Sequence, residues 1–325
     1  MGWGSGSDDA PAPAAPAPSE ARVRLIGGGY AFTAYLLWGV LPLYFVALLP
    51  TGAWELVAWR IVLSLVFCVV LLAVTRAWRP LLAIIRQPRL LGWTALAGGL
   101  IYANWMVYVL ATLSGHVVET SLGYFINPLV TVVLGVLVLR ERLRVTQWLA
   151  LGLAAIAVGV IVVGYGAFPW IALSLAFSFG IYGLIKKRIG TAVDAVSGLT
   201  LESAWLTPIA LVQLAVVATT SGLTLFTAGP GHAVLLLLAG VVTATPLLFF
   251  AAGARRTPLT VMGMLQFVAP ILQFAIGVWV FGEPMPVERW IGFALVWVAL
   301  IVLTADSLAA ARRGGRAGAD VAEVA

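Results

Sequence analysis

Ten long apolar runs, separated by short polar segments, restrict the fold of this chain more than any other feature of its sequence. Each run is close to the roughly 20 residues that a helix needs to cross the ~30 Å hydrocarbon layer of a bilayer. Lipid offers the backbone no hydrogen-bond partner, whereas a helix satisfies its own N–H and C=O groups. The expected spans are residues 30–49, 53–74, 90–113, 117–139, 148–163, 168–185, 199–218, 233–254, 258–281 and 290–305.

The composition agrees with this expectation. Of the 325 residues, 62% are hydrophobic and 10% are charged, whereas soluble domains have roughly 25% charged residues. The first run has no small-residue cleavage pattern and is followed by further runs, so we do not read it as a signal peptide. We therefore expect an all-α, multi-pass membrane protein with ten transmembrane helices.

The positions of lysine and arginine predict the orientation in the membrane, because cations near the ends of spans are retained in the cytoplasm. With the N-terminus inside, every Lys and Arg lies in a cytoplasmic segment except Arg289 and Arg60, which is within a span. Both termini are therefore expected on the cytoplasmic side of the cell membrane. The net charge of +6 follows from this topology and from the anionic inner leaflet, so no nucleic-acid partner is expected.

The two halves of the chain resemble each other. A shift of 142 residues aligns Phe125, Pro128, Glu141 and Trp148 with identical residues, beginning at Phe267, and needs no gap. Rare residue types keep their spacing in both copies, which indicates an internal repeat. Each copy holds five spans, so the second copy is inverted relative to the first, as in many secondary transporters. The expected parts are a disordered tail at 1–28, five-helix repeats at 29–164 and 165–306, and a disordered cytoplasmic tail at 307–325.

Several segments are similar to one transporter family. They are ELVAWR at 55–60, NW at 104–105, ETSLGYFINPLV at 119–130, RERLRVTQW at 140–148, LAFSFGIYGLIKK at 175–187 and PLLFFAAGARR at 246–256. Over about 30–306 the chain resembles the RarD-type branch of the EamA family in the drug/metabolite transporter superfamily. The resemblance implies two inverted five-helix repeats and movement of small metabolites or drugs, usually outward. The chain departs from the family at Val46 and Trp59, where a basic residue and a histidine are common.

Polar residues recur on one face of the expected fourth span. Their spacing is i, i+4, i+7 and i+11, and the 142-residue shift brings two glutamines of the ninth span onto the same stripe. Such side chains are costly in lipid, so we expect them to line a hydrated cavity that binds substrate. The alternative is a dry interface in which they join helices. The residues are Thr120, Tyr124, Asn127 and Thr131, with Gln266 and Gln273 in the second copy.

Arg60 is the deepest expected charge, about 10 Å from the outer end of its span. Glu55 is five residues away, on another side of the same helix, and cannot easily satisfy it. Either Arg60 binds an anionic or zwitterionic substrate, or it forms a structural ion pair with Glu119. In the third span Asn104 and Tyr108 share a face, and we group them with Trp105 as substrate-binding candidates.

Three carboxylates are candidates for gating or proton coupling: Glu55, Glu119 and Glu202. Glu55 and Glu202 are expected to begin corresponding spans on opposite sides of the membrane, which suits two gates. Ordinary solvated helix ends are the alternative. Glu141 and Glu283 are read as structural caps of the repeat.

The sequence favours a transporter over an enzyme. We find no catalytic triad or paired acids, no phosphate-binding loop and no spacing of His or Cys that suits a metal, so neither cofactor nor ATP is expected. An intramembrane enzyme acting on a lipid-like substrate is the alternative from another class, and a purely structural subunit is a third. The expected partners are a small-molecule substrate and the lipid bilayer, while a coupling proton and a homodimer are left open.

Overall fold

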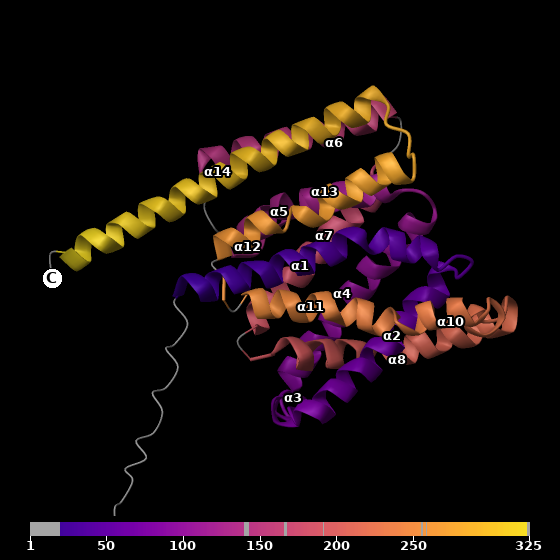
Figure 1. Ribbon diagram of the computed structural model, residues 1–325. Helices are drawn as coiled ribbons and strands as arrows, with labels where there is room; N and C mark the ends of the chain where they lie inside the picture. The colour runs from indigo at the N-terminus through magenta and orange to yellow at the C-terminus, as the bar shows by residue number, and fades with distance from the viewer. Residues whose placement is uncertain are drawn as a thin grey trace, which may run out of the picture.

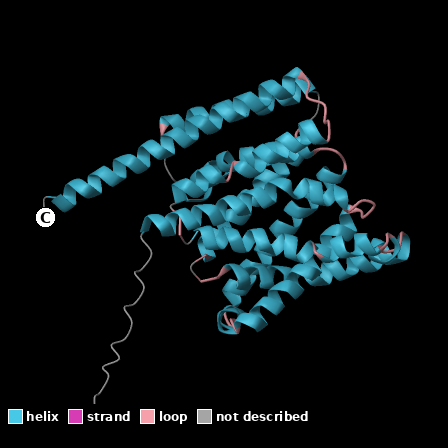
Figure 2. Ribbon diagram, viewed as in Figure 1, coloured by secondary structure: helices cyan, strands magenta, loops and turns pink. Residues whose placement is uncertain are grey.

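The computed structural model describes residues 20–139, 143–165, 168–190, 192–254, 256–257 and 259–323. These residues form helices joined by short connections, and no strand occurs among them (Figure 2). The first half contains α1 (Glu20–Ala47), α2 (Ala53–Thr75), α3 (Trp78–Ile85), α4 (Pro88–Leu113), α5 (Val117–Leu139) and α6 (Val145–Tyr165). The second half contains α7 (Trp170–Ile189), α8 (Ala195–Thr220), α9 (Thr224–Thr227), α10 (Pro230–Leu237), α11 (Ala239–Ala254), α12 (Leu259–Leu265), α13 (Val268–Ala275), the π-helical turn η1 (Ile276–Val280) and α14 (Val287–Glu323).

Nine segments within the described residues are long and apolar enough to cross a membrane. They correspond to nine of the ten expected spans, and α5 has the bounds that the sequence predicts. The tenth expected span, 168–185, is α7, whose apolar part, Trp170–Lys186, is shorter than the other nine. Many of these helices expose large apolar side chains, among them Trp54, Trp170 and Trp279, and such a surface suits contact with lipid.

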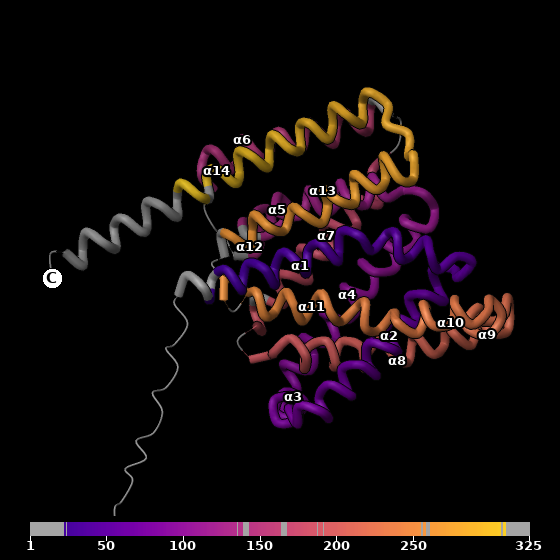
Figure 3. The backbone as a smooth tube through the Cα atoms, viewed as in Figure 1, coloured from indigo at the N-terminus to yellow at the C-terminus, as the bar shows by residue number. Residues whose placement is uncertain are grey.

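Two expected spans are interrupted rather than continuous. Residues 233–254 fall in α10 and α11, which meet at Leu238, and residues 258–281 fall in α12, α13 and η1. Figure 3 shows α12 and α13 following one another beside α1. The second break has a simple cause: Pro270 has no N–H to donate to the carbonyl of Gln266, where α12 has just ended.

The two ends of the chain differ from the sequence expectation. Helix α1 begins at Glu20, inside the segment 1–28 that was expected to be disordered, and residues 1–19 lie outside the described part. Helix α14 is described to Glu323, within the segment from residue 307 that the sequence analysis expected to be disordered. This segment is rich in alanine, a strong helix former, and it extends a helix that already exists.

The helices form one bundle in which α1 begins and α14 ends at the same end (Figure 1). At one edge α6 packs along α14, and elsewhere α2 packs on α8 and α5 on α13. Helix α1 contacts α11 and α13, helix α7 contacts α4 and α5, and both α2 with α11 and α4 with α8 are in contact. Helices of the first half are therefore packed mainly against helices of the second half.

Two glycines allow the backbones of neighbouring helices to approach closely. A Cβ atom on Gly240 of α11 would overlap the carbonyl group of Leu63 in α2, and one on Gly98 of α4 would lie 3.3 Å from the carbonyl oxygen of Glu202 in α8. Small residues at such crossings are typical of membrane helices, where close packing replaces the hydrophobic driving force. Gly98 and Gly240 are related by the same 142-residue shift that aligns the two halves.

We expect Gly240→Ala to destabilise the folded protein by about 1–3 kcal/mol, because the added methyl group meets backbone that cannot rotate away. Gly99→Ala is a matched control, since its Cβ atom would meet nothing within 4 Å. That control should keep the stability of the wild type or raise it by up to about 1 kcal/mol. Thermal unfolding in detergent, followed by fluorescence, measures both. Equal melting of Gly240→Ala and wild type would contradict the close approach.

Candidate functional site

Arg60 is buried in α2 and held by three other helices. Only 3% of its surface is exposed. Its guanidinium carbon lies 4.8 Å from the ring centroid of Phe45 in α1 and 4.9 Å from the ring of Trp105 in α4, within the ~6 Å range of cation–π contacts. Nε donates to Thr243 Oγ1 of α11 over 3.1 Å, whereas Nη1 is buried without a hydrogen-bond partner.

The structure does not pair Arg60 with Glu119. Glu119 Oε1 accepts from the backbone N–H of Ile171 at the start of α7, over 3.2 Å. Within the described part of the chain, no carboxylate lies within ion-pair distance of Arg60. Glu55 accepts hydrogen bonds from the Trp59 indole and from the backbone N–H of Thr224. The five-residue spacing predicted that Glu55 would not satisfy Arg60, because it places the two side chains on different sides of α2. The ion-pair alternative for Arg60 is therefore wrong.

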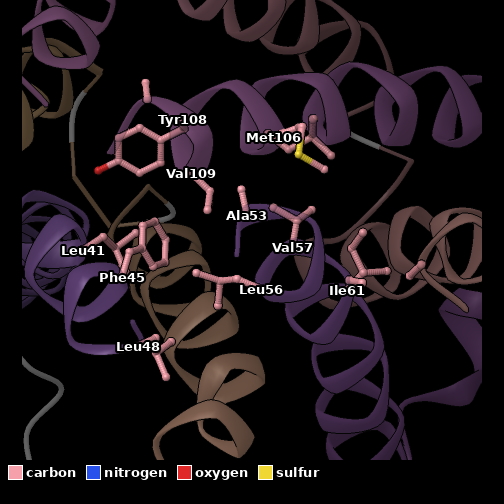
Figure 4. Packing of buried hydrophobic residues seen from close by; sticks show 14 of the residues in the cluster. Leu41, Phe45, Leu48, Ala53, Leu56, Val57, Ile61, Met106, Tyr108 and Val109 are labelled. Atoms are coloured by element: carbon pink, nitrogen blue, oxygen red, sulfur yellow. The ribbon is translucent and has the colours of Figure 1, made fainter. Parts of the chain in front are cut away.

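A series of aromatic rings, which we call the ring series, leads away from Arg60. Successive ring centroids are 5.7, 5.6, 6.0 and 5.9 Å apart, and the first three contacts are edge to face. These distances and angles are those that aromatic pairs prefer. The series is Phe45, Tyr108, Tyr124, Phe179 and Tyr182. Figure 4 shows its first two rings, with the hydroxyl group of Tyr108 directed away from Ala53 and Val57 of α2.

A polar network lies beside the ring series and joins α4, α5 and α7. Asn104 Nδ2 donates to the carbonyl oxygen of Leu175 over 3.2 Å and to Ser178 Oγ over 3.0 Å. Tyr124 donates its hydroxyl hydrogen to Asn104 Oδ1 over 3.3 Å. The Tyr108 hydroxyl is buried and has no partner. The structure thus brings together five of the residues that sequence analysis selected: Arg60, Asn104, Trp105, Tyr108 and Tyr124.

The remaining polar residues of α5 differ from one another. Thr120 is buried and donates to the carbonyl oxygen of Val117, and Thr131 is exposed and donates to that of Asn127, so each bonds within its own helix. Asn127 Oδ1 is buried without a partner and faces α7, where a Cβ atom on Gly180 would be 3.5 Å away. Asn127 is therefore the member of this group with unused hydrogen-bonding capacity.

The two glutamines of the second half also differ. Gln273 is 2% exposed, and its Nε2 donates to the carbonyl oxygen of Trp38 in α1 over 3.1 Å. That carbonyl lacks its helical partner because residue 42 is proline. Gln273 thus forms the kind of interhelical bond that the alternative reading described. Gln266 is half-buried at the break between α12 and α13.

Glu202 forms an ion pair at the far end of the ring series. Its Oε1 is 2.7 Å from Lys186 Nζ, and its Oε2 accepts from the Tyr182 hydroxyl over 3.1 Å. Glu202 is 2% exposed. It was expected at the start of a span equivalent to that of Glu55, but α8 begins earlier, where Asp194 accepts from two backbone N–H groups. Glu55 is therefore in the first turn of α2, whereas Glu202 is about two turns inside α8, and the two positions are not equivalent.

Glu283 has the capping role that the repeat suggested. Its carboxylate oxygens accept from the first two backbone N–H groups of α5, those of Val117 and Val118. Carboxylates at helix N-termini are stabilised by such unpaired donors. Burial raises the pKa of the Glu283 carboxyl above its ordinary value, and the two N–H donors oppose this shift. Its repeat partner, Glu141, lies outside the described residues.

Sequence reasoning missed several residues that complete these contacts. Thr243 and Ser178 carry no charge and follow no recognisable spacing, so nothing marked them. Lys186 was counted only among the cations that set orientation, although its position at the end of a span allows its amine to reach a buried partner. In the described ranges, no group of three or more His, Cys, Asp or Glu side chains is placed to hold a metal ion.

A bundle of apolar helices around a buried arginine and a polar network defines a multi-pass membrane protein with an internal polar site. The chain matches the model of the EamA-like transporter family over residues 25–163. It is 48% identical to Protein RarD of Streptomyces exfoliatus, with 87% of this chain and 90% of that protein aligned. It is 40% identical to Protein RarD of Escherichia coli K12, with 87% and 95% aligned. The chain belongs to the RarD-type branch of the EamA-like transporter family.

A solved structure described only as "Crystal structure of protein" has a similar fold. The TM-score is 0.55 at 18% sequence identity, and the match covers 87% of this chain and 98% of the other. At this identity the likeness concerns the fold alone.

We expect Lys186→Met to destabilise the protein by about 1–3 kcal/mol, because Glu202 would be left buried without its cation. The range is below the 3–5 kcal/mol of fully buried pairs, since Lys186 is partly exposed. The double variant Lys186→Met/Glu202→Gln should recover most of the loss, and Lys186→Arg should lose little. Melting temperatures in detergent measure the series. A double variant that melts below Lys186→Met would show that the pair is not the cause.

Proposed function

We propose that this chain is a secondary transporter that moves a small molecule across the cell membrane by alternating access and without ATP. The supporting observation is the symmetry of helix packing. In a five-plus-five repeat, α1, α2, α4, α5 and α6 correspond to α7, α8, α10–α11, α12–α13 and α14. The contacts of α1 with α11, α5 with α7 and α2 with α11 then have counterparts in α7 with α4, α13 with α1 and α8 with α4.

A two-fold symmetry would also exchange each helix of the first half with its equivalent in the second half. Three such equivalent pairs are in contact: α2 with α8, α5 with α13 and α6 with α14. A two-fold axis in the membrane plane accounts for this pattern, together with the aligned glycines Gly98 and Gly240. Transporters with inverted repeats bind substrate near the midplane between the two repeats.

The site that we propose lies between these halves. Arg60, Asn104, Trp105, Tyr108, Tyr124 and Asn127 come from the first half, and their neighbours Thr243 and Ser178 come from the second. Gln266 joins them in this proposal, because it is half-buried at the break between α12 and α13, where Pro270 has no N–H to donate to its carbonyl group. Thr120, Thr131 and Gln273 are assigned to helix packing instead.

The buried carboxylates fit two gates of this transporter. Glu55, Glu119 and Glu283 bind backbone N–H groups of other segments at the end of the bundle that we assign to the outside. We assign the ion pair of Glu202 and Lys186 to a second gate, at the cytoplasmic end of the bundle. Protonation of Glu202 would release Lys186. We infer outward movement of the substrate from the superfamily that the chain resembles.

The substrate site is tested by variants that separate transport from packing. Asn127→Ala should abolish most transport at near-normal melting temperature, because the Oδ1 atom that it removes has no partner. Gln273→Ala is the contrasting variant: it should lower the melting temperature, because the Trp38 carbonyl loses its donor. The measurement is an untargeted comparison of metabolites inside and outside cells that make each variant or none. If wild-type and empty cells export the same metabolites, the transporter assignment fails.

The orientation is tested by single cysteines in a Cys68→Ala background. Arg86 and Thr227 are both exposed, before α4 and in α9. In intact cells an impermeant maleimide should label Thr227→Cys at once and Arg86→Cys only after permeabilisation, because cation placement assigns Arg86 to the cytoplasm. The reverse pattern of labelling would invert the proposed topology.

A further inference from the structure

The contacts of Arg60 leave one part of its guanidinium available. Rings of Phe45 and Trp105 lie 4.8 and 4.9 Å from the guanidinium carbon, at cation–π distance. Nε is used by Thr243, and Nη1 has no partner. A buried N–H group without an acceptor is costly, and the cost is larger when the group is charged. Nη1 carries two N–H donors, and the oxygens of a carboxylate are the acceptors that a guanidinium pairs with most favourably.

The surroundings supply a second donor and no competing acid. The Tyr108 hydroxyl is buried without a partner, and its ring packs on Phe45, as the Arg60 guanidinium does. The phenol groups of Tyr44, Tyr108 and Tyr124 lie near Arg60 and are uncharged at neutral pH. Within the described ranges the groups near this cation are therefore rings and hydroxyls, and none is anionic. An anion bound there would accept from donors that otherwise have no partner.

The ring series indicates which kind of chemical group could be attached to an anion bound at Arg60. Tyr108 and Tyr124 are packed edge to face, and Phe179 continues the series beyond them. Flat unsaturated groups pack on such rings with favourable geometry. We propose that Arg60 and Tyr108 bind the carboxylate of the substrate and that the substrates are small monocarboxylates with a flat, unsaturated body. This inference rests on the proposed transport function.

The competing explanation is that Arg60 is a structural cation held by two rings. That role predicts a large loss of stability when the charge is removed. A binding role predicts the opposite, because Arg60→Gln removes a buried charge whose Nη1 donors have no acceptor and leaves no partner acid stranded. Residues that bind ligands are often unfavourable for stability in the unliganded protein.

Benzoate and benzamide form a matched pair of probes, since they differ in the carboxylate alone. Benzoate should raise the melting temperature of the purified wild-type protein, and benzamide should not. Arg60→Gln should weaken benzoate binding about ten- to a hundredfold, the effect of losing a charge-assisted hydrogen bond. Arg60→Lys should retain part of the affinity. Unliganded Arg60→Gln should melt at or above the temperature of the wild type.

Arg188→Gln is the control variant, because Arg188 also lies over a tryptophan, Trp93, at 5.0 Å, but is exposed. It should keep the full response to benzoate. Equal shifts with benzoate and benzamide, no shift with either, or an unchanged shift in Arg60→Gln would each overturn the inference. If metabolite export persists in any of these cases, the proposed transport function stands and the substrate class alone is wrong.

Discussion

The rest of the structure depends on one requirement: polar backbone groups inside the hydrocarbon must be bonded within the protein. Helices meet it along most of the chain, and two of the exceptions occur at prolines. Pro42 leaves the carbonyl of Trp38 without its helical donor, and Gln273 from the other half supplies one over 3.1 Å. Pro270 coincides with the break after α12. The defect at Pro42 is thus the place where a hydrogen bond between α1 and α13 forms.

The buried charges are compensated in three different ways. Carboxylates at one end of the bundle accept backbone N–H groups, as Glu119 does at α7 and Glu283 does at α5. Glu202 is compensated by Lys186 and the Tyr182 hydroxyl. Arg60 has aromatic rings and a single threonine hydroxyl. The carboxylates in the first two arrangements have hydrogen-bond or ion-pair partners, whereas Nη1 of Arg60 has none, and this difference distinguishes the candidate binding residue from the carboxylates of the proposed gates.

Sequence predicted the elements well because apolar length and helical spacing are local properties. The bounds of α5 follow from its apolar length, and the shared face of Asn104 and Tyr108 on α4 follows from an i, i+4 spacing. Partners across the bundle could not be predicted, because they depend on how helices pack. Thr243 and Ser178 are examples. Glu202 was misplaced for another reason: the capping residue Asp194, a readable local signal, was overlooked, and the start of α8 was set too late.

The two rings that flank Arg60 have a consequence for the response of this region to acid. An acidic counter-ion would take up a proton as the pH falls, and the charge of its neighbourhood would change. Phenyl and indole rings have no proton to gain or lose in that range, and a guanidinium stays protonated. The compensation of Arg60 by Phe45 and Trp105 is therefore insensitive to acidity. A change of substrate affinity with acid pH would therefore have to arise from the ionisation of the substrate or of groups farther from Arg60, such as Glu202.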